Sequence, residues 1–402
     1  MATLPRLAPQ AWMQSEETQA VLAALTAEGA EARFVGGCVR DALLGRRVKD
    51  IDIATPLPPE AVMARLRAAG LGVVPTGLAH GTVTAIARHR PYEITTLRRD
   101  VESFGRHARV AFTDDWEADA RRRDLTLNAL SCSAAGELWD YVGGLADLNA
   151  GRVRFVGPAR QRIAEDYLRL LRFFRFHAHY GRGEPDAEGL EAAAALAPQL
   201  ARISMERKRD ELMKLLAAPD PLPVLRVMAE RDVLGQVLPE AGRAELERLA
   251  RLLVRQPQAD PLERLAALLP ESREVAGTAR RLKLSNEQRD ALVFLRDPAT
   301  GSALLGDRLA FRRALQRWGR AAWLARLALL DEEGAAVEAA RADAAGWSPA
   351  PMPLQGADLV AAGFAPGPAL GEMLRQVEDW WLLQDRRPDR AACLARAREL
   401  AG

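Results

Sequence analysis

Short strand-like segments alternate with turns and short helical segments between residue 30 and about residue 140. Four stretches rich in β-branched residues predict strands: ARFVGG, KDIDIAT, GTVTAIARH and YEITTLR, of which the second and fourth alternate with a period of two. The stretch VRDALLG predicts a short helix ending at Gly45, and PPEAVMARLRAAG predicts a longer helix with proline in its first turn and Gly70 at its end. Together these elements predict a small α+β unit.

Strand signals almost vanish after residue 160. Alanine- and leucine-rich helical patterns continue to the end of the chain, interrupted by turns such as PDPLPV, LPESRE and GWSPAPMP. These patterns have no fixed period of the kind that repeat arrays require. The predicted fold class is therefore α+β, with a mixed N-terminal unit followed by an all-α remainder.

Length and composition restrict the class of protein. A chain of 402 residues predicts two or more packed units. The first residues contain no apolar run after basic residues, and no stretch has the roughly 18 apolar residues of a membrane span, so we expect a cytoplasmic protein. Three widely spaced cysteines, Cys38, Cys132 and Cys393, argue against a disulfide framework or a structural zinc site.

Charge adds a weaker signal. The net charge is only +2, but arginines are concentrated between Arg88 and Arg182, where a basic surface would suit a phosphate-rich partner. Counting alone supports equally well the alternative that arginine is simply the preferred solvating residue.

Two aspartates occur two positions apart in the predicted strand Lys49-Asp50-Ile51-Asp52-Ile53. Residues two apart on a strand point to the same face, so both carboxylates project together while Ile51 and Ile53 face the core. Oxygen ligands of this kind suit Mg²⁺, and a pair of such ions is typical of polymerase active sites. An Asp-x-Asp pattern alone more often marks a solvated strand face.

The sequence around this pair favours the catalytic interpretation. Gly36 and Gly37 end a strand and open a helix, so the backbone there can approach a phosphate, and Arg40 in the first turn adds a donor for a triphosphate. A glycine pair before a helix is also a common turn. Glu93 lies on a later strand and would complete a metal site if that strand pairs beside the Asp strand; otherwise it is a charge at a sheet edge.

At this point the chain resembles a known family. GGCVRDALLGRRVKDIDIAT is similar to the signature of class II CCA-adding tRNA nucleotidyltransferases, which share it with bacterial poly(A) polymerases. Further motifs follow in the family's order and rough spacing: EITTLRRD, GRHARVAFTDD, RRRDLTLNAL, DYVGGLADLNAGRVRFVG and EDYLRLLRFFRF. The resemblance covers residue 33 to about residue 180.

The resemblance implies a polymerase-β-like catalytic head over residues 1–140, a base-recognising neck over 141–215, and a tRNA-binding body and tail over 216–402. It implies that two Mg²⁺ ions are held by the catalytic carboxylates Asp50, Asp52 and Glu93. It also assigns the triphosphate to Gly36, Gly37, Arg40 and Asp41, and compares the segment from about Arg99 to Asp115 with a mobile loop of the family.

Two motifs concern the nucleotide itself. In the first, Arg123, Asp124 and Asn128 lie within RRRDLTLN, and a helix there would place Asp124 and Asn128 on one face, able to meet a ribose or phosphate. In the family this motif discriminates ribose from deoxyribose. The alternative is a solvated basic patch.

The second motif contains Glu165, Asp166, Arg169 and Arg172, which follow helical spacing. Cytosine and adenine carry an amino group where uracil and guanine carry a carbonyl, so a carboxylate accepts hydrogen bonds from the first two bases and repels the others. Asp166 and Arg169 are expected to form this protein template, with Glu165 orienting Arg169. The alternative is a set of ordinary intrahelical ion pairs.

Other segments predict structural roles. The segment from Asp140 to Asp147 predicts a glycine turn between head and neck. The resemblance implies that this turn changes conformation between nucleotide-bound states. Ser204-Met205-Glu206-Arg207 predicts a serine-capped helix start. Trp380 and Trp381 are expected in a core rather than in an RNA-stacking surface. All five histidines precede residue 180, and we expect no metal-dependent hydrolase activity of the kind that some bacterial members have.

We therefore expect template-independent addition of CCA to a tRNA 3′ end from CTP and ATP, with no membrane and no protein partner implied. The alternatives are poly(A) addition or addition of A alone by the same chemistry. A small-molecule nucleotidyltransferase would lack the base-reading helix and the helical tail. A non-catalytic RNA-binding protein is the alternative from a different class, and the three clustered acids argue against it.

Overall fold

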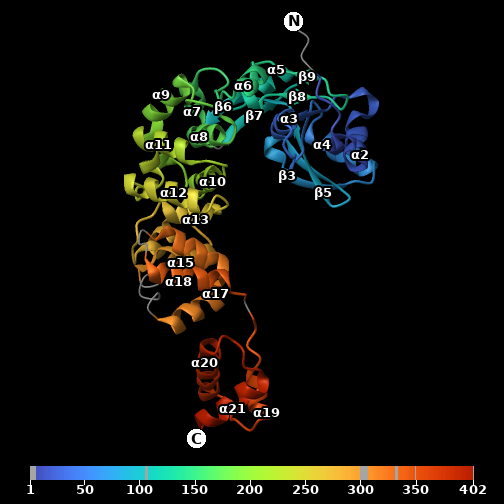
Figure 1. The fold of residues 1–402 in the computed structure, drawn as a ribbon. Helices are drawn as coiled ribbons and strands as arrows, with labels where there is room; N and C mark the ends of the chain where they lie inside the picture. Colours follow the sequence, from blue (N-terminus) through green and yellow to red (C-terminus); the bar gives the residue numbers. More distant parts are fainter. Residues whose placement is uncertain (1–5, 105–106, 299–306, 331–333, 349, 402) are drawn as a thin grey trace. The chain divides into compact units, whose positions relative to one another are not determined.

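The computed structural model describes residues 6–104, 107–298, 307–330, 334–348 and 350–401. The chain divides into two compact units, Met1–Val237 and Leu238–Gly402. Figure 1 labels their helices and strands. The first unit contains a mixed sheet followed by helices, and helices make up the described part of the second unit. The head, neck and body boundaries expected near residues 140 and 215 stay predictions.

A seven-stranded sheet forms the centre of the N-terminal half of the first unit, with the order β3-β4-β5-β2-β1-β8-β9. Strands β2 and β5 run parallel, whereas β1 pairs antiparallel with both β2 and β8. The strands are β1 Arg33–Val35, β2 Asp52–Thr55, β3 Gly72–Gly77, β4 Thr82–Ala87, β5 Arg90–Thr96, β8 Ser131–Cys132 and β9 Leu138–Trp139. The four strands predicted from sequence are confirmed as β1, β2, β4 and β5, whereas β3, β8 and β9 were not predicted.

One face of this sheet is covered by helices. Helices α2 (Glu16–Thr26) and α4 (Pro59–Ala68) pack against each other and against β4. Alternate residues of β4 are buried, Val83 at 1% exposure and Ala85 at 0%. Thr82 and Thr84 point to the opposite face of the pleat. That second face also carries Glu93, the cross-strand partner of Thr84.

The two predicted helices of this half are confirmed. The stretch VRDALLG forms the end of α3 (Gly37–Leu43), and α4 begins at Pro59. The N-terminal segment adds the short helix α1 (Ala11–Gln14). Strand β2 begins only at Asp52, so the prediction that Asp50 belongs to the strand is wrong, although the burial of Ile51 and Ile53 follows the predicted alternation.

A two-stranded sheet forms in the segment compared above with a mobile loop. Strands β6 (Arg98–Phe104) and β7 (His107–Phe112) pair antiparallel, and residues 105–106 lie outside the described part of the chain. Helix α5 (Trp116–Arg121) follows, capped by the Asp115 side chain, and leads into the 3-10 turn η3 (Thr126–Asn128).

The rest of the first unit consists of helices, as the loss of strand signals predicts. Its longest helix, α8 (Leu168–Tyr180), buries Leu170, Phe173 and Phe174 on one side and packs against α10 and α11. The other helices are α6 Gly144–Ala150, α7 Ala159–Glu165, α9 Ala187–Leu196, η4 Ala197–Arg202, α10 Met205–Leu216, α11 Leu222–Glu230 and η5 Leu234–Gln236.

The second unit has its own core around Trp323, Leu315 and Phe294. Trp381 is 2% exposed, as expected for a core residue, whereas Trp380 is only half-buried. Across the described residues, no helix is both long enough and apolar enough to cross a membrane. The helices are α12 Arg243–Arg255, α13 Pro261–Ala267, α14 Val275–Arg281, α15 Asn286–Arg296, α17 Arg308–Leu329, α18 Ala335–Ala345, α19 Gly356–Ala361, α20 Pro368–Leu383 and α21 Arg390–Ala401.

Candidate active site

A cleft of about 400 Å³ lies within the first unit, between Asp52 of the sheet and helix α8. Its walls come from segments more than a hundred residues apart in the sequence. It is lined by Gly36, Gly37, Arg40, Asp52, Arg122, Arg123, Asp124, Asn128, Arg169, Arg172 and Phe176. Nine of these were predicted from the sequence as site residues; Arg122 and Phe176 were not.

Two of the predicted carboxylates lie side by side on neighbouring strands. Asp52 of β2 and Glu93 of β5 are register partners in the parallel pair. Burial and the nearby charge of Glu93 raise the pKa of Asp52 to about 6; Asp50 adds to this rise, and Arg123 opposes it. The three acids therefore lie close enough to repel one another, although Asp50 is exposed and precedes the strand.

This carboxylate set fits a hard divalent cation. Its donors are oxygens, and their mutual repulsion is a cost that a bound cation would remove. Among the described residues, no group of three or more His, Cys, Asp or Glu side chains is already arranged to hold a metal ion. The metal role of Asp50, Asp52 and Glu93 therefore belongs to the proposal below.

The glycine pair forms one wall of the cleft. Gly36 has a φ of +71°, a conformation that favours glycine, and a Cβ there would lie 3.2 Å from Nη1 of Arg123. Arg123 also donates from Nη1 to the Asn128 carbonyl and pairs with Asp119. The absence of a side chain at Gly36 thus leaves room for a guanidinium group beside the cleft.

Asp119 is a structural acid that the sequence reasoning missed. It is 3% exposed and pairs with Arg122 at 2.7 Å and Arg123 at 3.1 Å. Burial acts to raise the pKa of Asp119, but the charges of Arg123 and Arg122 outweigh it and lower the pKa. Its spacing of three and four residues from these arginines, which directly follow α5, was the available signal.

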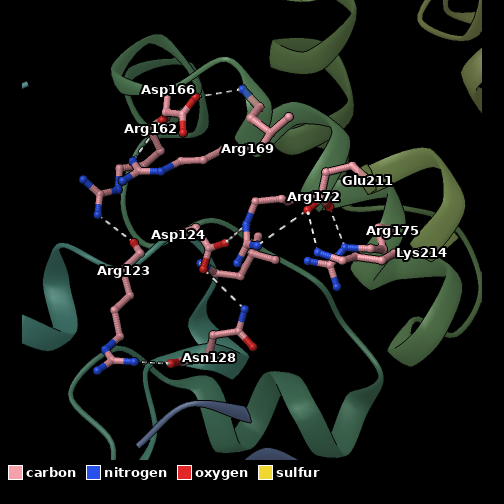
Figure 2. Close-up of polar contacts among 12 residues, drawn as sticks. Arg123, Asp124, Asn128, Arg162, Asp166, Arg169, Arg172, Arg175, Glu211 and Lys214 are labelled. Atoms are coloured by element: carbon pink, nitrogen blue, oxygen red, sulfur yellow. Dashed lines mark hydrogen bonds and ion pairs between the residues drawn. The ribbon is translucent and has the colours of Figure 1, made fainter. Parts of the chain in front are cut away.

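Asp124 lies at the centre of a chain of polar contacts (Figure 2). Its carboxylate accepts from Arg172 at 2.6 Å, from the Asn128 side-chain amide at 3.3 Å and from the Leu125 N–H at 2.8 Å. Burial acts to raise the pKa of Asp124, but the charge and hydrogen bond of Arg172 lower it to about 2. Asp124 is therefore ionised over the whole physiological pH range.

The predicted helix at this motif is wrong, although Asp124 and Asn128 still lie together. Asp124 precedes the 3-10 turn η3, and Leu125 forms an isolated β-bridge with Phe155. This long-range bridge keeps the backbone extended where the local spacing predicts a helix. The turn nevertheless brings the Asn128 amide back to Asp124.

Arg40 lies against the same motif from α3. Its Nη1 donates to the Asn128 side-chain oxygen at 2.6 Å, and its Nε and Nη2 donate to the two oxygens of Asp41. Asp41 does not line the cleft. In this structure it orients Arg40 rather than reaching the cleft itself.

The base-recognition motif divides between two groups of contacts. Arg169 lines the cleft, and its Nη1 donates to Glu165 at 2.5 Å and to the Arg162 carbonyl at 3.1 Å. Arg162 also pairs with Glu165 at 2.6 Å. The expected orientation of Arg169 by Glu165 is therefore present as a direct contact.

Asp166 has a partner that the sequence analysis did not assign to it. Arg207, near the start of α10, donates to both oxygens of the Asp166 carboxylate, at 3.3 and 2.7 Å. Ser204 occupies the N-cap position of α10, but its side chain makes no capping hydrogen bond. The prediction of one helix through Glu165, Asp166 and Arg169 is wrong, because Asp166 has extended backbone between the end of α7 and the start of α8. The segment predicted as a helix cap thus also supplies an arginine to this break between the helices, 41 residues away in the sequence.

The glycine turn after β9 is well defined in the structure. The Asp140 carboxylate accepts from the backbone N–H groups of Val142, Gly144 and Leu145. Asp147 is buried and accepts from the Thr126 hydroxyl at 2.7 Å. The turn therefore packs against the 3-10 segment that positions Asn128.

Two regions of the chain match described families. Residues 32–154 match the Poly A polymerase head domain, and residues 184–244 match a probable RNA and SrmB-binding site of polymerase A. The first match contains the glycine pair, the three carboxylates and the Asp124 motif. The second begins after α8 and includes Arg207.

Relatives extend the similarity over most of the chain. The mitochondrial CCA tRNA nucleotidyltransferase 1 of Mus musculus is 36% identical over 371 residues, which is 88% of this chain and 83% of the mouse protein. The CCA-adding enzyme of Latilactobacillus sakei subsp. sakei strain 23K is 33% identical over 409 residues, 95% of this chain and 97% of that protein.

A solved structure gives the same result for the fold. The crystal structure of the Bacillus stearothermophilus CCA-adding enzyme in complex with CTP superposes with a TM-score of 0.70 at 27% identity, covering 92% of this chain and 97% of that chain. The expected fold class, a mixed α+β head followed by helices, is confirmed.

Proposed function

Because the chain belongs to the family of CCA tRNA nucleotidyltransferases, we propose that this nucleotidyltransferase adds C, C and A in turn to the 3′ end of tRNA, using CTP and ATP. The observation that carries the proposal is the single cleft that joins Asp52 of β2 to Arg169 and Arg172 of α8. The Asp52 carboxylate, which is suited to metal-assisted nucleotidyl transfer, thus lies in the same cleft as two arginines that can form hydrogen bonds with a base.

Asp50, Asp52 and Glu93 would hold Mg²⁺ at the sheet end of this cleft. When bound, Mg²⁺ supplies activation of the attacking 3′-hydroxyl and stabilises the charge on the leaving pyrophosphate. The Gly36 turn and Arg40 then receive the triphosphate, since both line the cleft beside Asp52. Asp124 accepts hydrogen bonds from the ribose hydroxyl groups, and the Asn128 amide forms hydrogen bonds with the ribose as well.

Base selection rests on Asp166 and Arg169. A carboxylate at Asp166 accepts from the amino group of cytosine or adenine, and Arg169 donates to the adjacent ring nitrogen. Two donors of Arg207 hold the Asp166 carboxylate in place, and Glu165 limits the positions that Arg169 can adopt. The template is therefore preorganised by protein contacts before a nucleotide binds.

One assay separates this function from its alternatives. Transcripts of tRNA ending at the discriminator, at C and at CC, together with an unstructured RNA, are incubated with CTP and ATP singly and together. Stepwise completion of CCA on the three tRNA substrates is the expected result. A homopolymer of A on the unstructured RNA would instead indicate poly(A) addition, and extension only of the CC transcript would indicate an A-adding enzyme.

The same assay tests a purely RNA-binding function. Binding of tRNA without incorporation into any substrate would overturn the enzymatic proposal. The match of residues 184–244 to an RNA-binding family supports tRNA as the polymer substrate. The names of the vertebrate relatives place those proteins in mitochondria, and the cytoplasmic location expected for this chain stays a prediction.

A further inference from the structure

Arg40 is held more tightly than its role as one phosphate donor requires. It is 7% exposed, and three of its nitrogens donate to Asp41 and Asn128. These contacts occupy the edges of the planar guanidinium group. The flat face of the Arg40 guanidinium group remains available for stacking. The side chain that stacks on this face limits how far the group can tilt into the cleft.

Two aromatic side chains of α8 lie against this group. The guanidinium carbon of Arg40 is 4.2 Å from the ring centroid of Tyr180 and 5.2 Å from that of Phe176. Tyr180 and Phe176 are four residues apart and share one side of the helix. The Tyr180 hydroxyl also donates to Asp41 Oδ1, the oxygen that accepts from Arg40 Nε. Tyr180 therefore restrains Arg40 directly through its ring and indirectly through Asp41.

The other end of α8 carries the base-facing arginines Arg169 and Arg172. Tyr180 lies eleven residues after Arg169, which corresponds to about 16 Å along a helix axis. Helix α8 thus lines the cleft where the base is expected to bind, through Arg169 and Arg172. It also restrains Arg40, which is expected to bind the triphosphate. Both sets of contacts lie within the first unit.

We propose that Tyr180, together with Phe176, is a positioning residue for nucleotide binding, which sets Arg40 against α8 and so fixes the distance between the triphosphate and base sides of the cleft. The inference rests on the proposed function, because it assigns the nucleotide to this cleft. It goes beyond that function in giving a role to two aromatic residues of α8 to which the sequence motifs assigned none.

The test compares Tyr180→Phe, which keeps the ring and removes the hydroxyl, with Tyr180→Leu, which removes both. Equilibrium binding of ATP and of CTP is measured by calorimetry, and KM and kcat are measured with tRNA. For Tyr180→Leu we expect the Kd and KM of both nucleotides to rise about tenfold, the effect of one stacked cation, with a smaller rise for Tyr180→Phe. The preference for CTP over UTP should not change, because Asp166 and Arg169 are untouched.

A double-mutant cycle asks whether Tyr180 acts through Arg40. If it does, Tyr180→Leu added to Arg40→Gln weakens ATP binding no further than Arg40→Gln alone. Additive effects would overturn the inference, as would wild-type Kd values for a folded Tyr180→Leu protein. Should Tyr180→Leu fail to fold, Tyr180→Phe decides the question: an ATP Kd equal to that of the wild type then overturns the inference.

Tyr92→Phe is the matched control, because it removes a hydroxyl contact of the same kind, 3.1 Å from Thr18 in the head core. We expect it to change the melting temperature without changing the Kd for ATP. The binding measurements also separate the two proposals. A wild-type protein that binds ATP but extends no RNA refutes the proposed function, whereas an active wild type with unaffected Tyr180 variants refutes only this inference.

Discussion

At the scale of single residues, Asp166 has to be held in place and still accept a hydrogen bond from a base amino group. Two donors of Arg207 and the Leu168 N–H hold its carboxylate. Since these contacts leave acceptor lone pairs available, the residue can be fixed in place and still bind a base.

Replacing Asp166 by alanine is therefore expected to remove base choice while leaving the carboxylate pair of the head intact. The ratio of kcat/KM for CTP over UTP should fall by about 100-fold, because hydrogen bonds to a base edge contribute roughly 1–3 kcal/mol of discrimination against the wrong base. The measurement is single-nucleotide addition to a tRNA ending at the discriminator. A retained preference for CTP would contradict the template role, and Arg209→Ala on α10, the helix that supplies Arg207, serves as the control.

Asp50 allows the catalytic role to be tested apart from folding. It is exposed and precedes β2, so Asp50→Ala should not change the melting temperature. If it helps to bind Mg²⁺, its loss should lower kcat by about 10³-fold or more. Glu60→Ala, which removes an exposed acid from α4, should leave kcat unchanged. Near-normal turnover in Asp50→Ala would refute the metal role.

At the scale of elements, the features that could be predicted from the sequence are those that depend on residues close together in the chain. The α8 pattern, the glycine pair and the Glu165–Arg169 contact all depend on spacings of one to four residues. The pairing of Asp166 with Arg207 joins different helices and has no local signal. The extended backbone at Leu125 depends in the same way on a distant bridge partner, Phe155.

Helix α6 shows how closely two elements approach beside the cleft. A Cβ on Gly144, at the start of α6, would lie 2.1 Å from the Thr126 carbonyl oxygen. Gly144→Ala should therefore separate α6 from η3 and lower the free energy of unfolding by about 3 kcal/mol, measured by urea denaturation. Gly235→Ala, where a Cβ would meet nothing within 4 Å, should change it by much less. Equal stabilities of the two variants would refute this close packing.

Helix α8 also gives the stability of the protein a pH dependence. Burial lowers the pKa of His177, which is 7% exposed, below its ordinary value of 6.5. As the pH falls through 6.5, the unfolded chain takes up a proton that the folded chain does not, so stability is present above this pH and is lost below it. The slope is at most about 1.4 kcal/mol per pH unit for one histidine.

His177→Gln should reduce this slope between pH 7 and pH 5, measured as the free energy of unfolding at each pH. The exposed His80→Gln variant is the control and should keep the wild-type slope. An unchanged slope in His177→Gln would show that this histidine is not responsible. Burial lowers the pKa of His179 as well, which adds a slope of the same sign, whereas the raised pKa of Asp52, about 6, adds a slope of the opposite sign below that pH.

At the scale of the whole molecule, the second unit is stabilised by buried arginines that bind the carbonyl groups of helix ends. Arg326 of α17 has 0% exposure; it donates to the carbonyl oxygens of Leu295 and Asp297 and to the Glu271 carboxylate. Arg248 of α12 similarly donates to the carbonyls of Ala267 and Leu269. The described cleft residues all belong to the first unit, so nucleotide binding and these contacts stabilise different parts of the chain.

Calorimetric unfolding of the intact chain should therefore show two transitions with different responses. ATP at about 100 times its Kd should stabilise only the transition of the first unit, by about 2.7 kcal/mol. Arg326→Met leaves buried carbonyls without their donor, so it should lower only the second transition, by about 3 kcal/mol or more. A single transition shifted by both changes would mean that the two units unfold together, because each change would then act on the stability of the entire chain.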